Sequence, residues 1–104
     1  MKIAKLFEFQ IFEEGWEEYA GELVERILDA LDDYCRERYG DLPHERELCY
    51  SKFSNYGFDE LVGLFGTIRD RELLVKMPYR VYKEYSYLLQ EKIQSRLEGL
   101  RWRI

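Results

Sequence analysis

Two long amphipathic segments of opposite charge constrain the fold of this chain more than any other feature of its sequence. Residues 13–39 carry ten acidic residues against three arginines, whereas residues 76–104 carry seven basic residues against three glutamates. Such an asymmetry favours either mutual attraction within one fold or two surfaces for different partners. If the two segments lie side by side, their exposed flanks attract each other.

The first segment predicts a long helix over residues 14–39. Acidic residues crowd its first turn, and Arg36 and Arg38 stand in its last turn, an arrangement that suits the helix dipole. Gly40 and Pro43 are typical of a helix end. The apolar residues recur at helical spacing and form one broad stripe: Trp16, Tyr19, Ala20, Leu23, Val24, Ile27, Leu28, Leu31, Tyr34 and Cys35.

A second long helix is predicted to begin at Pro78, because proline suits the first helical position. Residues 100–104 follow this helix and alternate in polarity, which fits either a short closing strand or a frayed helical end. Its apolar stripe consists of Val81, Tyr85, Leu88, Leu89, Ile93, Leu97 and Leu100.

The segments between and before these helices predict short strands and one short helix. Apolar and polar residues alternate over residues 2–12 and 47–54, and residues 71–77 carry a short apolar run. Residues 58–65 fit a two-turn helix that Gly66 ends. The resulting order predicts an α+β fold, a ferredoxin-like split βαβ sandwich with both long helices on one face of a small antiparallel sheet.

Composition indicates one domain over residues 1–104 and limits its environment. The chain has no apolar run long enough to span a membrane and no recognisable leader, so we expect a cytoplasmic protein. Cys35 and Cys49 are then expected to be reduced thiols without a function. Charged residues reach 36%, while amides are scarce, which is typical of a thermophile.

The acidic residues of the first helix are one candidate binding surface. They would form an outer face able to dock a basic partner, although a merely solvated face is the more ordinary interpretation. A single helix face does not make oxygen ligands converge, so we predict no metal site here. The candidate residues are Glu18, Glu22, Glu25, Asp29, Asp32 and Asp33.

A tyrosine-rich basic stretch is the candidate for binding RNA or single-stranded DNA. Aromatic rings can stack on bases while neighbouring cations pair with phosphates. The acidic net charge of −5 argues against a general nucleic-acid binder, and core or boundary tyrosines explain most of the pattern. The candidate residues are Tyr79, Arg80, Tyr82, Lys83, Arg101 and Arg103.

His44 is the single histidine and therefore the candidate for a small hydrolase or nuclease. Glu45 or Glu47 could orient it, but no motif supplies a nucleophile. The spacing of Cys35, His44 and Cys49 matches no zinc pattern. We therefore predict no catalytic residue, no metal and no cofactor.

These observations favour a small non-enzymatic module that binds a macromolecular partner. We expect an unknown protein partner and a homodimer formed through the open sheet face or a strand edge. Nucleic-acid binding is the alternative, and hydrolysis with His44 is the second alternative. A virus or plasmid accessory protein of a thermophile fits the compact, aromatic-rich sequence, which has none of the usual catalytic motifs.

Overall fold

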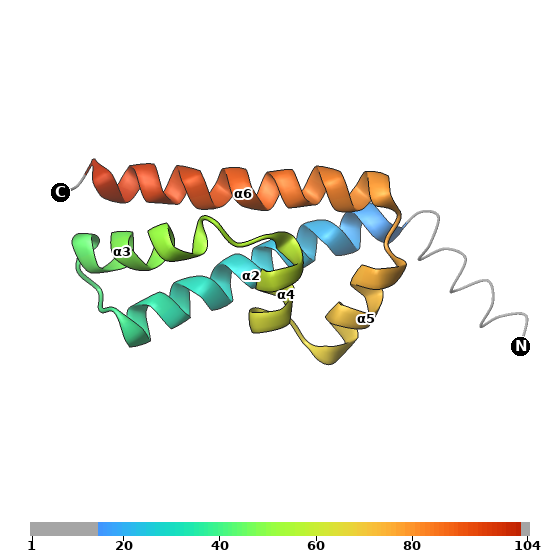
Figure 1. Cartoon of the computed structure of the whole chain (residues 1–104), viewed down its shortest axis with the longest axis horizontal. Helices are drawn as coiled ribbons and strands as arrows, with labels where there is room; N and C mark the ends of the chain where they lie inside the picture. Colours follow the sequence, from blue (N-terminus) through green and yellow to red (C-terminus); the bar gives the residue numbers. More distant parts are fainter. Residues whose placement is uncertain (1–14, 103–104) are drawn as a thin grey trace, which may run out of the picture.

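The computed structural model describes residues 15–102 and folds them into five helices (Figure 1). The described part of the chain contains no strand, so the predicted ferredoxin-like α+β sandwich is wrong. The strand predicted over residues 2–12 and the last two residues of the chain lie outside the described range. In chain order the helices are α2 (Trp16–Arg38), α3 (Pro43–Phe53), α4 (Phe58–Phe65), α5 (Ile68–Lys76) and α6 (Tyr79–Arg101).

The two long helices confirm the helical part of the sequence analysis. α2 matches the predicted segment, and α6 begins directly after Pro78 and runs alongside both α2 and α3 (Figure 1). Five members of the α6 stripe are buried, whereas Tyr85 and Leu88 are half-buried at its edge. The core is therefore made where the stripes of α2 and α6 meet the buried residues of α3 and α4.

α3 replaces the strand predicted over residues 47–54. Pro43 occupies the first turn, where a missing N–H leaves no intrahelical bond unmade, and Glu45 Oε1 accepts a hydrogen bond from the Leu42 N–H at 3.2 Å. The buried residues are Cys49, Tyr50 and Phe53, which are spaced as one helical face. The alternation of polar and apolar residues over residues 47–54 therefore does not indicate a strand, because the buried residues follow the spacing of a helix.

The turn between α2 and α3 depends on Gly40. Its φ of +112° lies in a region that favours glycine. A Cβ built there would come within 2.2 Å of Glu45 Oε1. The glycine therefore lets the chain reverse and lets the Glu45 carboxylate reach back to the start of α3.

α5 replaces the strand predicted over residues 71–77. Thr67 Oγ1 accepts a hydrogen bond from the Asp70 N–H at 3.0 Å, and Asp70 Oδ2 accepts one from the Thr67 N–H at 2.9 Å. This reciprocal capping pair begins a helix, so the following run of apolar residues continues as one. The predicted helix at residues 58–65 is confirmed as α4, and it ends at Gly66 as expected.

A disulfide between Cys35 of α2 and Cys49 of α3 corrects the prediction of reduced thiols. Both cysteines are fully buried, and their Cα atoms lie 5.6 Å apart, within the range that allows a bridge. The strand misassigned to residues 47–54 concealed this pairing, because only the helical α3 turns Cys49 toward the stripe of α2. The bond ties two helices of the core together.

Candidate functional site

An open pocket of about 200 Å³ lies where α2, α3 and α4 meet. Its wall is mostly aromatic, and we call it the aromatic pocket. α2 and α3 contribute one ring each, the turn after α3 contributes another, and the end of α4 closes the far side. Its lining residues are Tyr34, Lys52, Phe53, Tyr56, Leu64 and Phe65.

The rings of the aromatic pocket pack edge to face. Phe53 is the centre of the cluster, with ring centroids 5.5 Å from Tyr34, 5.6 Å from Phe65 and 5.0 Å from Tyr56. Tyr34 and Phe65 complete a triangle at 5.7 Å. Such pairs are favourable beyond the area they bury, so the wall is pre-formed. Only Phe53 is fully buried, and the other three rings keep part of their surface open.

Two cations border this aromatic wall. Arg38 places its guanidinium carbon 5.5 Å from the centre of the Tyr34 ring, and Lys52 places its ammonium nitrogen 5.5 Å from the centre of the Phe53 ring. Leu64 adds an aliphatic side chain that is 58% exposed. The pocket therefore combines an apolar wall with a positive edge.

A second group of polar residues, the Asp32 cluster, joins α2, α3 and α6. The Asp32 carboxylate accepts hydrogen bonds from Arg46 and, at 2.8 Å, from the Tyr50 hydroxyl. It also pairs with Arg36 at 3.2 Å. Arg96 Nη1 donates to the Tyr50 hydroxyl at 3.4 Å, which links α6 to the cluster.

The Asp32 cluster is unsuited to exchange protons near neutral pH. Burial opposes ionisation of Asp32, but hydrogen bonds from Tyr50 and Arg46 outweigh burial and lower its pKa. Burial raises the pKa of Tyr50, and the hydrogen bond to Asp32 adds to the shift. The carboxylate thus stays ionised and the phenol stays protonated, which is unfavourable for general acid–base catalysis.

A third group, the Asp70 cluster, attaches α5 to α2. Arg26 donates to both Asp70 oxygens at 2.8 and 2.9 Å, and the Tyr19 hydroxyl donates at 2.7 Å. The Arg26 guanidinium is the main cause that lowers the pKa of Asp70, although burial opposes it. Burial, with help from the carboxylate, raises the pKa of Tyr19. This cluster is an anchor between helices.

The structure separates the predicted nucleic-acid residues into two groups. Tyr79, Arg80, Tyr82 and Lys83 lie in the first turns of α6, whereas Arg101 is its last residue, about 30 Å away at the helical rise of 1.5 Å per residue. Arg103 lies outside the described residues. The five described residues therefore lie at opposite ends of α6.

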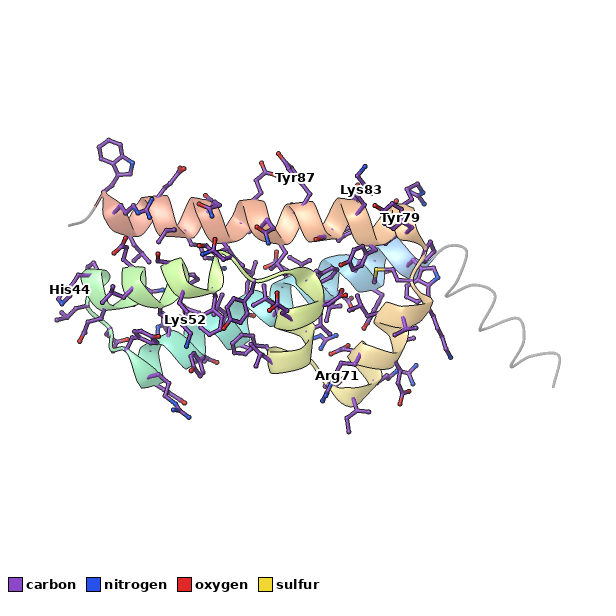
Figure 2. All side chains as sticks on the ribbon, in the orientation of Figure 1. His44, Lys52, Arg71, Tyr79, Lys83 and Tyr87 are labelled. Atoms are coloured by element: carbon purple, nitrogen blue, oxygen red, sulfur yellow. A yellow bond between two sulfur atoms is a disulfide. The ribbon has the colours of Figure 1, made fainter. Side chains whose placement is uncertain are left out.

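Within the first group, two tyrosines form an exposed stack. The Tyr79 ring is 73% exposed and stacks on the Tyr82 ring with centroids 6.3 Å apart. Tyr82 also packs on the core residue Phe58 at 5.7 Å. Arg80 forms an ion pair with Glu17 at 3.1 Å, and Lys83 points outward from α6 (Figure 2).

The predicted acidic surface of α2 is present but incomplete. Glu18, Glu22, Asp29 and Asp33 are exposed. Glu25 is also exposed, but it pairs with Lys92 of α6 at 3.1 Å. Asp32 lies in the cluster described above, so it is not part of an outer acidic face. A role for the exposed members in partner binding stays a prediction.

His44 is exposed in the first turn of α3 and points away from the rest of the molecule (Figure 2). Its neighbour Glu45 is engaged with the Leu42 N–H, so it does not orient the imidazole. Over residues 15–102, no group of three His, Cys, Asp or Glu side chains is placed to hold a metal ion. No helix in that range is long and apolar enough to cross a membrane.

Sequence reasoning missed both the aromatic pocket and the Asp70 anchor. The aromatic residues of the pocket were assigned to a helix stripe, a strand and a turn, so nothing indicated that they converge. Asp70 stands in the charged run from Arg69 to Glu72, yet it is only 3% exposed. The spacing of Thr67 and Asp70, a capping pair, was the signal that could have revealed this helix start.

Comparison of the chain with protein-family models, with curated proteins and with solved structures finds no match.

Proposed function

We propose that this protein is a small non-enzymatic interaction module that binds a segment of a protein partner in the aromatic pocket. The observation that carries this proposal is an apolar, ring-lined pocket left open to solvent on an otherwise highly charged chain. Centrally placed aromatic pockets of this kind accept the anchoring side chains that dominate protein interfaces.

The size of the pocket supports a single bulky apolar anchor. A volume of about 200 Å³ suits one leucine, methionine or phenylalanine side chain. Full burial of such a side chain contributes about 1.5–3 kcal/mol. Binding through one anchor is therefore expected to be weak to moderate unless neighbouring contacts add to it.

The charges beside the pocket indicate the chemistry that surrounds this anchor. Arg38 and Lys52 hold positive charge directly over two of the rings. A partner with aspartate or glutamate next to its apolar anchor would satisfy both features. The proposed ligand is therefore an apolar residue flanked by acidic residues in a protein segment.

The titratable groups support a non-enzymatic role. The shifted pKa values of Asp32 and Asp70 are lowered, and those of Tyr19 and Tyr50 are raised. All four shifts move the pKa values further from neutral pH, whereas the pKa of a catalytic acid or base is usually shifted toward it.

The test is selection of peptides from a displayed random library on the purified protein. We expect enrichment of sequences with one bulky apolar residue next to acidic residues. Their affinity should fall sharply with Leu64→Glu, which places a carboxylate at the pocket, and with Lys52→Glu. Leu48→Glu is the matched control, because Leu48 is 59% exposed but lies outside the lining. Peptides that bind Leu64→Glu as well as the wild type would contradict the proposal.

A second candidate function is binding of single-stranded RNA or DNA at the start of α6. The exposed Tyr79–Tyr82 stack favours it, because bases stack on such rings. Lys83 supplies a cation beside a shallow groove that Arg80, Glu84 and Tyr87 also line. A retarded band with a single-stranded oligonucleotide, lost on Tyr79→Ala, would support it, whereas an unchanged band would reject this surface.

The homodimer remains a proposal, but the surface that was predicted to form its contact is not present in the described residues. An open sheet face was expected to carry the contact, but the described residues form no sheet. Light scattering at high protein concentration tests the oligomeric state directly. A mass of 12.7 kDa, that of one chain, would reject the dimer.

A further inference from the structure

A second hollow, of about 330 Å³, lies between α2, α3 and α6 on the outer side of the Asp32 cluster. We call it the polar hollow. Its lining combines charges of both signs with one buried leucine. The lining residues are Asp29, Asp32, Arg46, Arg96, Gly99 and Leu100.

The guanidinium of Arg96 is an unmatched cation in this hollow. Three other bases of α6 each pair with an acid of a neighbouring helix: Arg80 with Glu17, Lys92 with Glu25 and Arg101 with Glu47, all at 3.1 Å. Among the described residues, no carboxylate lies within 4 Å of Arg96. Its recorded contact is the 3.4 Å hydrogen bond to Tyr50, so most of its donors remain free.

Arg46 lines the hollow from α3 but is already engaged. Its Nη2 donates to Asp32, and its Nε is buried out of reach of solvent, so neither nitrogen is open to a ligand in the hollow. Arg46 therefore contributes positive charge to the wall rather than a free hydrogen-bond donor.

Asp29 is the unmatched anion of the polar hollow. Its exposed carboxylate lines the hollow from α2 and forms no ion pair with any residue between 15 and 102. Asp32, by contrast, already accepts from Arg46, Arg36 and Tyr50. The hollow therefore presents one free negative group and one free positive group, each on a different helix.

Gly99 keeps the polar hollow open. A glycine inside a helix is unfavourable relative to alanine, and a packing neighbour usually explains it. Here a Cβ added to Gly99 would meet no atom within 4 Å, so no close packing demands the glycine. The missing side chain leaves space in the wall of the hollow itself.

We infer that the polar hollow binds a small zwitterion of the α-amino-acid type. Its carboxylate accepts hydrogen bonds from the guanidinium of Arg96, and its ammonium donates to Asp29. Leu100, which is 6% exposed, forms the apolar floor beneath the aliphatic carbons. This site is separate from the aromatic pocket, since the two share no lining residue.

The test is titration of the ¹⁵N-labelled protein with glycine, alanine, acetate and methylammonium, followed by amide chemical shifts. We expect saturable shifts around residues 29–32 and 96–100 with the two amino acids, and much weaker binding of acetate or methylammonium. Arg96→Gln and Asp29→Asn should each weaken glycine binding by about tenfold or more, which corresponds to about 1.4 kcal/mol for the loss of one charged contact.

A matched pair of glycine variants controls for helix stability. Gly99→Leu should fill the hollow and abolish glycine binding while all charges remain. Gly63→Leu in α4 is the control, because its Cβ also meets no atom within 4 Å but lies outside the hollow. Thermal melts verify that each variant folds, and Arg96→Lys replaces Arg96→Gln if the latter does not.

Three results would overturn the inference. The first is the absence of saturable shifts with either amino acid. The second is binding of acetate as tight as that of glycine and tightened further by Asp29→Asn, which would indicate a plain anion site. The third is equal binding by Gly99→Leu and Gly63→Leu.

Discussion

α5 is attached to the molecule by different physical means from the other four helices. α2, α3, α4 and α6 share an apolar core, and a buried disulfide joins α2 to α3. α5 has Asp70 as its only buried side chain, and its apolar residues Ile68 and Val75 are 69% and 87% exposed. Short helices with little buried apolar surface open at low free-energy cost. The four core helices are thus stabilised by burial and a covalent bond, whereas α5 depends mainly on a polar anchor.

This difference bears on the aromatic pocket, because one of its walls is the end of α4 next to α5. Tyr34 and Phe53 belong to the well-buried helices, whereas Leu64 and Phe65 belong to the end of α4 that leads into α5. The first wall is fixed by the core. The second wall is held by the buried residues of α4, and its last residues also lie next to α5, which the Asp70 cluster attaches to α2.

Removal of the disulfide should have the largest effect. The Cys35→Ala, Cys49→Ala double variant frees a loop with a sequence separation of 14 residues. In the chain-entropy account, closure of a loop of this size stabilises a fold by about 3 kcal/mol. Guanidinium unfolding should show this loss as a lower midpoint for the whole domain. An unchanged midpoint would mean that apolar burial alone holds α2 and α3 together.

Asp70→Asn should have a smaller effect, confined to α5. It weakens the contacts of Arg26 and Tyr19 and the cap of α5, for an expected loss of about 2 kcal/mol, toward the low end for a buried charge because Arg26 is half-exposed. Hydrogen exchange should show faster exchange in α5 than in the wild type, with α2 and α6 unchanged.

Glu72→Gln is the control for Asp70→Asn, because Glu72 is an exposed acid of the same helix. It should leave exchange in α5 unaltered. If the two variants exchange alike, the buried carboxylate is not the anchor of α5.

The acid limb of the stability curve should reveal the same anchor. The pKa of Asp70 is lowered in the folded state, mainly by Arg26, so its contribution is complete above the unfolded pKa near 4. It is lost as pH falls from about 5 toward the lowered value. Denaturant unfolding should show that the free energy of unfolding falls less steeply with decreasing pH in Asp70→Asn than in the wild type. Some dependence on pH remains in the variant, because the pKa of Asp32 is also lowered.

The long helices could be predicted from sequence because their patterns span many turns. α2 and α6 bury stripes that repeat over six turns or so, and a period read over that length is unambiguous. The strand predicted over residues 47–54 was wrong because a segment of eight residues fits both the two-residue period of a strand and the 3.6-residue period of a helix. The buried set of Cys49, Tyr50 and Phe53 fits a helix, while the flanking Leu48 and Lys52 imitate alternation.

The candidate sites were harder to predict than the helices, for a different reason. The aromatic pocket and the polar hollow each combine residues from three helices, and a wrong α3 removes one wall from both. Nothing in the sequence distinguishes Arg96 or Gly99. Only the packing of α6 shows that Arg96 has no acidic partner among the described residues and that a Cβ at Gly99 would meet no atom within 4 Å. Contacts that depend on tertiary packing leave no local pattern.

The charge asymmetry that first set the two long helices apart should have the smallest effect on stability. Two ion pairs join them, Arg80 with Glu17 and Lys92 with Glu25, which confirms that their flanks meet. Both pairs are exposed, so each contributes no more than about 1 kcal/mol. Arg80→Glu should therefore lower the melting temperature slightly at low salt and hardly at all at high salt, where screening is stronger.

Lys83→Glu is the matched comparison, because Lys83 lies one turn further along α6 and has no ion pair within the described residues. It should leave the melting temperature nearly unchanged at either salt concentration. If the start of α6 instead serves nucleic acid, both variants should abolish a gel shift equally, whatever they do to stability. Equal destabilisation by the two variants would show that the general charge of α6, rather than the specific pair with Glu17, attracts it to α2.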